Sequence, residues 1–195
     1  MVYRMYKKCI KRLLDILLSF TGIVVLSPLY VILWILIRCK LGKPAIFTQD
    51  RPGKNEKVFR LYKFRSMTDE RDEEGNLLPD EKRLTHFGKV LRASSLDELP
   101  ELFNILKGDM SLVGPRPERP QFVEKFKEEI PRYMVKHQVR PGLTGWAQVN
   151  GLRGDSSIKK RIEYDIYYIE NWTLGFDIKI ILMTFFTGFI NKNAY

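Results

Sequence analysis

The sequence predicts a bent membrane helix near its N-terminal end, followed by a mixed domain with one clear strand and several helices. An apolar segment covers residues 13–37, and shorter stretches of mixed polarity replace it after residue 44. Charge follows the same division, because residues 1–43 carry a formal charge of +7 and residues 44–195 only +3. We therefore predict a membrane domain over 1–43 and a second domain over 44–195.

The apolar segment has 25 residues, of which 19 are apolar. It is longer than the apolar part of a cleaved signal peptide, so we expect it to remain in the protein. Ser27 and Pro28 lie near its middle, where proline removes a backbone donor and should bend the helix, while the Ser27 hydroxyl satisfies a freed backbone group. Asp15, near the start of the segment, is expected at the membrane interface close to Arg12.

Basic residues flank the apolar segment on both sides, whereas a helix that spans a membrane usually has its positive charge on the cytoplasmic side only. This symmetry favours a re-entrant helix-break-helix, with both chain ends on one side, over a straight span. The flanking residues are Lys7, Lys8, Lys11 and Arg12 before the segment, and Arg38, Lys40 and Lys43 after it.

Several classes of protein are excluded by composition. Cys9 and Cys39 are the only cysteines, which rules out a disulfide framework and suits a reducing compartment. His86 and His137 stand alone, without the spacing of zinc ligands. The low charge beyond residue 44 and the lack of a basic stripe argue against nucleic acid as a partner.

Beyond residue 44, polarity patterns predict individual elements. Residues 57–64 alternate like a half-buried strand, and the acidic segment 69–81, with seven carboxylates, reads as a solvated loop. Helical periodicity occurs in three stretches, and the apolar tail 174–190 suits an interfacial helix or ordinary core packing equally well. The three helical stretches are 99–107, 121–129 and 158–171.

The densest group of reactive side chains contains the adjacent carboxylates Asp97 and Glu98. Ser95 and Glu98 have the spacing of a capping box, but Pro100 would then disrupt the second turn, so the alternative is a helix that starts at Pro100. In both cases the carboxylates lie at a helix N-terminus, where the helix dipole favours the ionised form that a nucleophile needs. Neighbouring residues point in different directions, so we expect the two carboxylates to have different roles.

Two further stretches are suited to ligand binding. Prolines on both sides of Arg116 restrict its backbone, which suits a fixed phosphate contact, although a solvated surface arginine fits equally well. Residues 140–151 combine three glycines with Trp146 and amide side chains, which indicates either a close-fitting loop around a base or sugar, or a structural turn.

Five short motifs together resemble the bacterial sugar transferases known as monotopic phosphoglycosyl transferases. The resemblance extends from about residue 11 to residue 182, and the length is similar to that of the small members of the family. The motifs read YKFRSM at 62–67, SLDELPEL at 95–102, GDMS at 108–111, PRP at 115–117 and RPGLTGWAQ at 140–148.

This resemblance implies transfer of a phosphosugar from a UDP-sugar to a polyprenol phosphate, usually undecaprenyl phosphate, with release of UMP. That reaction begins the assembly of a membrane-bound glycan, such as an exopolysaccharide or a glycoprotein glycan. The implied fold is α/β, mainly helical and irregular, with a re-entrant membrane helix, a cytoplasmic catalytic domain and interfacial amphipathic helices. The implied location is the cytoplasmic face of the bacterial plasma membrane.

The resemblance also implies roles for individual residues. Asp97 matches the nucleophile, which forms a covalent phosphosugar intermediate, and it matches the contact to an expected Mg²⁺ ion. Glu98 matches the second member of the catalytic pair, and the break at Ser27 and Pro28 matches the bend of the membrane helix. The implied phosphate or substrate contacts are Lys63, Arg65, Arg92, Arg116, Arg140 and Gln148.

The sequence leaves three matters open. It does not identify the sugar of the donor or the glycan pathway, and it is equally compatible with a monomer and a homo-oligomer. The alternative function is a non-catalytic membrane scaffold for polysaccharide assembly, in which Asp97 and Glu98 cap a helix and the arginines bind lipid headgroups.

Overall fold

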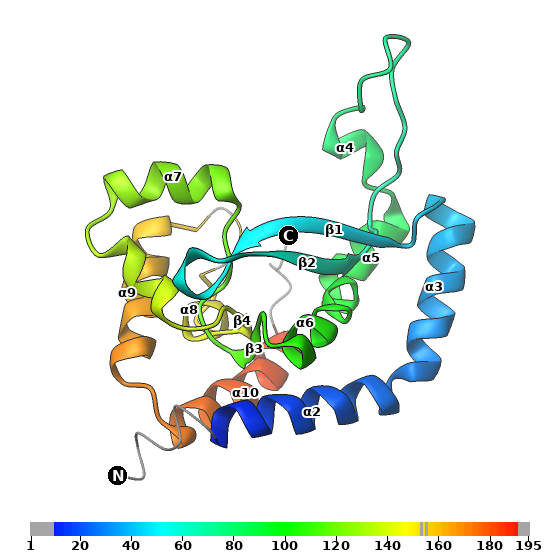
Figure 1. Cartoon of the computed structure of the whole chain (residues 1–195). Coiled ribbons are helices and arrows are strands. Elements are labelled where there is room, and N and C mark those ends of the chain that lie inside the picture. The colour runs from blue at the N-terminus through cyan, green and yellow to red at the C-terminus, as the bar shows by residue number, and fades with distance from the viewer. Residues whose placement is uncertain (1–9, 153, 155, 191–195) are drawn as a thin grey trace.

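The structure is a computed structural model that describes residues 10–152, 154 and 156–190. The flanking residues Lys7 and Lys8, together with Cys9, lie outside this range. The described chain is largely helical with two small sheets, and Figure 1 shows the β1–β2 hairpin crossing the centre of the molecule above α2. The α/β class expected from the sequence is therefore confirmed, whereas membrane placement is a separate question.

The apolar segment forms two helices, α2 (Lys11–Val25) and α3 (Ser27–Leu41), joined at Leu26 and bent by 62°. Pro28 lies in the first turn of α3, where its missing N–H breaks no helical hydrogen bond. The Ser27 hydroxyl donates to the Val24 carbonyl at 2.8 Å, as expected for a broken helix. Among the described residues no single helix has the length and apolarity to cross a bilayer, but this bent pair together meets both criteria.

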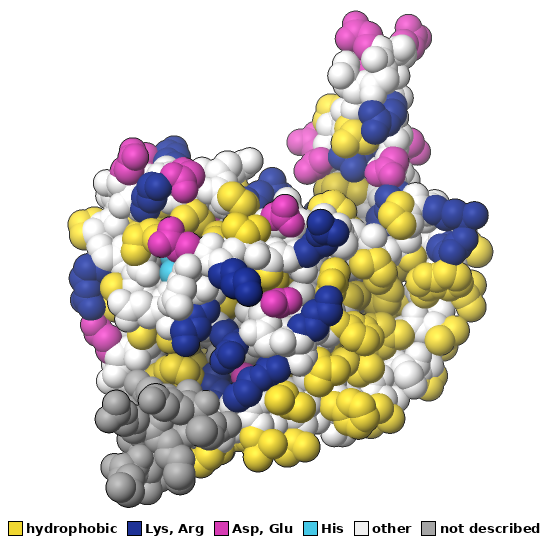
Figure 2. Space-filling view, in the orientation of Figure 1, with side chains coloured by type: hydrophobic (Ala, Val, Ile, Leu, Met, Phe, Trp, Pro, Cys, Tyr) yellow, Lys and Arg dark blue, Asp and Glu magenta, His cyan; other side chains and the backbone are white. Residues whose placement is uncertain are grey.

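The outer sides of α2 and α3 are apolar and exposed. Figure 2 shows this hydrophobic surface spread over both helices, whereas basic side chains gather over the middle of the same face. Monomeric soluble proteins rarely expose an apolar patch of this extent, so the surface indicates contact with lipid or protein. Its residues on α2 and α3 are Leu13, Leu17, Leu18, Phe20, Val24, Val25, Val31, Ile32, Trp34, Ile35 and Leu36.

The position expected for Asp15 was wrong. Asp15 is only 3% exposed, and its Oδ1 accepts hydrogen bonds from the Ser111 hydroxyl at 3.1 Å and the Leu112 backbone N–H at 3.0 Å. These partners lie almost a hundred residues further along the chain, so no local pattern could reveal them. Asp15 therefore ties α2 to the interior of the molecule.

A β-hairpin follows the bent helices. Strand β1 (Ile46–Pro52) pairs antiparallel with β2 (Val58–Phe64), and the short 3₁₀ turn η2 (Lys54–Glu56) joins them. The strand predicted at 57–64 is thus confirmed, and its alternation places Phe59 and Leu61 in the core. Strand β1 was not predicted, because its charged and polar residues mask the alternation.

The acidic segment projects from the body of the protein as an arm (Figure 1), with acidic side chains at its tip (Figure 2). It is mostly loop, as predicted, with one bridge between Arg71 and Leu77 and a single turn of helix, α4 (Asp80–Arg83). Water and salt screen the repulsion between these exposed carboxylates, so no buried cation is needed to neutralise them.

The remaining elements form the body around the hairpin. The helices predicted at 121–129 and 158–171 are confirmed within a residue, and the one predicted at 99–107 begins two residues later. The elements are α5 (His86–Ala93), η3 (Leu96–Glu98), α6 (Glu101–Lys107), β3 (Ser111–Val113), α7 (Pro120–Glu129), η4 (Tyr133–Gln138), β4 (Gly142–Thr144), α8 (Trp146–Val149), α9 (Ile158–Glu170) and α10 (Leu174–Ile190).

The glycines of the 140–151 block have a structural role. Strands β3 and β4 pair in parallel, and a Cβ atom on Gly142 would lie 2.1 Å from the backbone nitrogen of Gly114. Only glycine permits this backbone approach. Of the two interpretations left open for this block, the structural turn is the one that its glycines support.

The bent helices share hydrophobic cores with the rest of the chain. Leu33 and Ile37 of α3 pack in one cluster with Phe64 and Leu91, and Ile23 of α2 packs against the cluster that contains Leu102. The tail helix α10 packs in the core on one side, which is one of its two expected roles, and its place at a membrane interface stays a prediction. Its inner side is buried at Ile180, whereas its outer side exposes Ile178, Leu182, Phe185 and Phe186.

Candidate active site

Asp97 and Glu98 lie in the short turn η3, between α5 and α6. Ser95 precedes them in the left-handed conformation, with φ 55°, and its side chain makes no capping hydrogen bond. The capping box is therefore absent. Pro100 is the N-cap of α6, within one residue of the helix start given by the alternative prediction. Asp97 and Glu98 therefore precede α6, and both side chains are buried in the interior of the protein.

Two cations hold Glu98. Its Oε1 accepts hydrogen bonds from Lys63 Nζ at 2.6 Å and from Arg116 Nη2 at 2.5 Å. Burial alone would raise the pKa of Glu98, but attraction and hydrogen bonding by Arg116 and Lys63 outweigh it and hold this pKa well below its usual range. Glu98 is therefore a permanent anion that fixes the position of both cations.

Glu101 is a third carboxylate at this site, and it was not among the residues expected from the sequence. It is fully buried on the first turn of α6, 3.3 Å from Lys63 Nζ. Burial, and then repulsion by Glu98, raise the pKa of Glu101 to about 7. Its three-residue spacing from Glu98 was a visible signal, because such residues share one face of a helical turn. We call Lys63, Asp97, Glu98, Glu101 and Arg116 the site cluster.

Asp97 is the member of the site cluster with unused bonding capacity. Within the described part of the chain its buried Oδ1 has no hydrogen-bond partner. Burial raises the pKa of Asp97 to about 6, partly opposed by Lys63, so the dipole effect expected from the sequence is outweighed. Near neutral pH the carboxylate still predominates over the acid, as a nucleophile requires.

Two more predicted phosphate contacts lie on the segments beside Asp97. Arg92, in the last turn of α5, donates through Nε to the Ser66 hydroxyl at 2.9 Å. Gly88 lets α5 approach this segment, because a Cβ there would lie 1.9 Å from the Ser66 carbonyl oxygen. Arg65 forms an ion pair with Asp69 at 2.8 Å. Attraction by Arg92 also opposes the rise that burial causes in the pKa of Asp97.

The loop that carries Arg116 is held from behind by buried polar contacts. Glu118 accepts a hydrogen bond from Arg161 Nη1 at 2.7 Å, and Arg51 Nη1 donates to the Pro117 carbonyl at 3.1 Å. Next to this pair, Lys136 and Asp165 form an ion pair at 3.4 Å. We call Glu118, Lys136, Arg161 and Asp165 the anchor cluster. Its partners come from segments far apart in the sequence, which is why sequence patterns missed it.

Arg140 and Gln148, also predicted as substrate contacts, have other surroundings. Arg140 Nε donates to the Gly108 carbonyl at 2.8 Å, and the residue lines a cavity beside α2 that does not include Asp97. Gln148, on α8, is buried and donates to the Leu143 carbonyl of β4 at 3.1 Å. Their assignment to substrate binding stays a prediction.

The acidic residues of the site suit a divalent cation shared with a substrate. Among the described residues no group of three or more His, Cys, Asp or Glu side chains is arranged to hold a metal by itself. Mg²⁺, however, commonly uses one or two carboxylates together with substrate phosphates. The free Oδ1 of Asp97 fits this mode of binding, so the predicted contact agrees with the residues present.

Comparison with known proteins gives a consistent group of relatives. Residues 6–191 match the family model described as bacterial sugar transferase. The chain is 48% identical over 180 residues to the uncharacterized sugar transferase EpsL of Bacillus subtilis, covering 90% of this chain and 85% of EpsL.

Two longer relatives have names that state a reaction. The chain is 44% identical to a UDP-glucose:undecaprenyl-phosphate glucose-1-phosphate transferase of Klebsiella pneumoniae, covering 95% of this chain and 41% of that protein. It is 46% identical to a UDP-N-acetylgalactosamine-undecaprenyl-phosphate N-acetylgalactosaminephosphotransferase of Aeromonas hydrophila, covering 92% and 44%. The chain thus spans less than half the length of these two proteins.

Proposed function

The chain belongs to the bacterial sugar transferase family, and from this membership and the site geometry we propose that it transfers a phosphosugar from a UDP-sugar to a polyprenol phosphate. The lipid acceptor is undecaprenyl phosphate, and the products are UMP and a polyprenol diphosphate sugar. One observation carries the proposal most directly: a buried carboxylate with an unpartnered oxygen, Asp97, lies beside a cluster of fixed cations. The names of the two longer relatives support the same substrates.

In the first step a carboxylate oxygen of Asp97 attacks the phosphorus that bears the sugar. A bond forms between this oxygen and the phosphorus, and the bond to the bridging oxygen breaks, so that UMP leaves with the electron pair. In the second step a phosphate oxygen of the polyprenol phosphate attacks the same phosphorus. The bond to Asp97 breaks, the carboxylate is regenerated and the lipid diphosphate sugar is released.

The cations of the site cluster reduce the repulsion between a carboxylate and a diphosphate. Lys63 and Arg116 are held by Glu98, so they need no rearrangement when negative charge develops on the transferring phosphoryl group. Arg92 adds a third positive charge near Asp97. The described contacts thus support separate roles for the two adjacent carboxylates, with Asp97 reacting and Glu98 positioning the cations.

Mg²⁺ would be held by Asp97 and by oxygen atoms of the diphosphate. When bound, the ion neutralises charge on the phosphoryl oxygens and stabilises UMP as a leaving group. Glu101 is a weaker candidate ligand, because its pKa of about 7 leaves it partly protonated near neutral pH. We therefore assign it no metal contact.

The bent helix pair suits the meeting of a soluble and a lipid substrate. We infer that α2 and α3 enter one leaflet of the bacterial plasma membrane from the cytoplasmic face and return, with their exposed apolar side in hydrocarbon. The Tyr30 hydroxyl of α3 donates to the Leu99 carbonyl at 2.5 Å, which links the membrane helix to the turn beside Asp97. In a background with Cys9 and Cys39 replaced by serine, single cysteines replacing Tyr3 and Tyr195, which lie outside the described residues, should both resist an impermeant thiol reagent in intact cells. Labelling of only one would indicate a span.

The reaction is tested by measuring UMP release from a panel of UDP-sugars with the purified full chain, Mg²⁺ and undecaprenyl phosphate. Asp97→Asn removes the charge with little change in volume, and we expect turnover to fall by about a thousandfold or more. Asp50→Asn, on the exposed strand β1, is the matched control and should keep normal turnover.

A second measurement tests the covalent intermediate. With UDP-sugar labelled at the sugar-bearing phosphorus and no acceptor, label should remain on the wild-type protein and be absent from Asp97→Asn. Normal turnover in Asp97→Asn would overturn the mechanism. Absence of UMP release from every donor would instead favour the scaffold function.

A further inference from the structure

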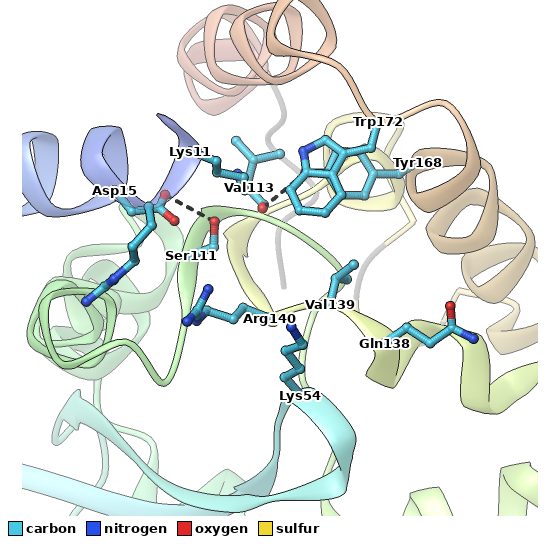
Figure 3. A pocket seen from close by; sticks show the side chains of 11 residues that line it. Lys11, Asp15, Lys54, Ser111, Val113, Gln138, Val139, Arg140, Tyr168 and Trp172 are labelled. Atoms are coloured by element: carbon cyan, nitrogen blue, oxygen red, sulfur yellow. Dashed lines mark hydrogen bonds between the residues drawn. The ribbon is translucent and has the colours of Figure 1, made fainter. Parts of the chain in front are cut away.

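A basic cavity of about 220 Å³ lies beside α2, away from Asp97. Its walls come from α2, from the turn of the β1–β2 hairpin and from the segment before β4. Figure 3 shows Lys54 extending from the hairpin toward Arg140, whose guanidinium points to the side of the cavity where Asp15 lies. The charged residues of the lining are Lys11, Arg12, Lys54 and Arg140, against the single carboxylate of Asp15.

Part of this charge is already neutralised or bonded. Lys11 forms an ion pair with Asp177 of α10 at 2.8 Å. Arg12 donates to the Ile105 carbonyl at 2.6 Å and to the Leu106 carbonyl at 2.9 Å. Asp15 accepts its two hydrogen bonds from the β3 segment, so it already has partners of its own.

The other two cations have donors to spare. Arg140 bonds through Nε only, to the Gly108 carbonyl. In the part of the chain that the structure describes, neither its terminal guanidinium nitrogens nor Lys54 Nζ have a hydrogen-bond or ion-pair partner. These donors enter one cavity from two separate segments, which is the arrangement that a multiply charged anion requires.

Two guanidinium groups meet at Gly108. Arg140 bonds to its carbonyl, and Arg12 Nη2 would lie 3.2 Å from a Cβ atom placed on this glycine. Like charges held this close repel each other, and an anion between them relieves the repulsion. The Gly108 position therefore brings together charges that an anionic ligand would stabilise.

We propose that this basic cavity is a second phosphate-binding site, separate from the site cluster. No lining residue belongs to the site cluster, and the charges that act on Asp97 come from Lys63, Glu98, Arg92 and Arg116. The ligand is a phosphate group carried by a membrane lipid or by a soluble compound. A lipid tail could follow the exposed apolar side of α2, which begins at Leu13, next to Arg12.

Binding is tested by calorimetric titration of the purified full chain in a nonionic detergent. The probes are inorganic phosphate, UMP, dihexanoyl phosphatidic acid and, as the zwitterionic control, dihexanoyl phosphatidylcholine. Lys54→Gln and Arg140→Gln should each weaken binding of the phosphate monoesters by about tenfold or more. Lys57→Gln, on the same hairpin but outside the cavity, should leave the affinity unchanged.

Preference among the probes identifies the source of the phosphate. Tighter binding of phosphatidic acid than of inorganic phosphate and UMP supports a lipid headgroup, and equal affinities support a soluble phosphate. If Arg140→Gln does not fold, Lys54→Gln decides alone, because Lys54 is exposed on a turn. Equal affinities in wild type and both variants, or no binding of any monoester, would overturn the proposal.

Two further variants separate this site from the proposed reaction. Asp97→Asn should keep the phosphate affinity of the basic cavity, whether or not the wild-type protein shows turnover. If Arg116→Gln abolishes binding while Lys54→Gln does not, the phosphate binds at the site cluster, and the second site is excluded.

Discussion

Asp97 and Asp165 make an instructive pair, because burial raises the pKa of both carboxyl groups to about 6 and each lies near a lysine. Their surroundings nevertheless differ. Lys136 and Asp165 are sealed together, each with a side chain only 2% exposed. Beside Asp97, the side chains of Lys63 and Arg116 are 18% and 32% exposed. A raised pKa therefore does not distinguish the carboxylate that we propose to react from a structural one, whereas the accessibility of the neighbouring cations differs between the two sites.

The two clusters also differ in how their charges balance. In the anchor cluster each carboxylate has its own cation, Glu118 with Arg161 and Asp165 with Lys136. In the site cluster three carboxylates share Lys63 and Arg116, and these carboxylates differ widely in pKa. Balanced pairs suit a structural support, whereas an excess of carboxylates suits a site that takes a cation, such as the proposed Mg²⁺, together with its anionic substrate.

The first test of this comparison measures turnover and uses Glu98→Gln. Without its charge, Lys63 and Arg116 lose the anion that holds them beside Asp97, and we expect UMP release to fall roughly 100-fold. Glu118→Gln is the matched control, since it removes the charge opposite Arg161 in the anchor cluster. Its turnover per folded molecule should stay within a few fold of wild type. An equal loss of turnover in both variants would contradict the separate roles of the site cluster and the anchor cluster.

The second test concerns stability. Lys136→Met leaves the Asp165 carboxylate buried without its cation, which should lower the free energy of unfolding by about 3–5 kcal/mol. Adding Asp165→Leu removes the remaining charge and should recover most of the loss. Denaturant or thermal unfolding in detergent measures both changes. If the double variant has no higher free energy of unfolding than Lys136→Met, the Lys136–Asp165 pair contributes more to stability than the neutralisation of a buried charge.

The third test uses the raised pKa of Glu101. The folded state binds this proton more tightly than the unfolded chain, so stability should fall as the pH rises from about 4 to about 7. Glu101→Gln lacks this decline and should exceed the wild type in unfolding free energy by about 1–2 kcal/mol at pH 8. Unfolding measured at pH 5 and pH 8 gives the comparison. If Glu101→Gln is no more stable than the wild type at pH 8, ionisation of Glu101 does not lower the free energy of unfolding.

The smallest effect belongs to His137, which lies against Lys136 of the anchor cluster. Its Nδ1 lies 3.2 Å from the Gly53 carbonyl, Glu56 is also near, and burial lowers its pKa. The unfolded chain therefore binds the proton more readily, and stability should fall by about 1 kcal/mol as the pH drops below about 6.5. His137→Gln should flatten this dependence, whereas His86→Gln, at an exposed position, should preserve it. Identical pH profiles for the two variants would contradict the assignment.

Local features of the sequence predicted well the elements that depend on interactions between residues close together in the chain. A proline in the middle of a long helical segment forces a break, so the bend at Ser27 and Pro28 followed from the sequence, and the alternation of residues 57–64 marked β2. Asp97 and Glu98 stood out because adjacent carboxylates before a helix are chemically distinctive. The Gly142 turn was visible as a pattern, although its structural role was not distinguishable from ligand binding.

What the sequence did not predict depends on distant partners. The burial of Asp15 required Ser111, and the support of the Arg116 loop required Arg161, which lies 43 residues beyond Glu118. The three-residue strands β3 and β4 are too short to produce a periodic signal. Only the folded chain brings these segments together, so their contacts carry no local signature.

The close backbone contact between Gly114 and Gly142 has a consequence for the entropy of ligand binding. Strand β3 leads directly to the loop of Arg116, and β4 follows directly after Arg140, so one rigid pair of strands positions both basic side chains. Their backbone is already ordered in the folded protein, so little conformational entropy remains to be lost when a phosphate ligand binds. Any side chain at either glycine would separate the strands, and the resulting loop disorder would lower affinity without removing a single charge.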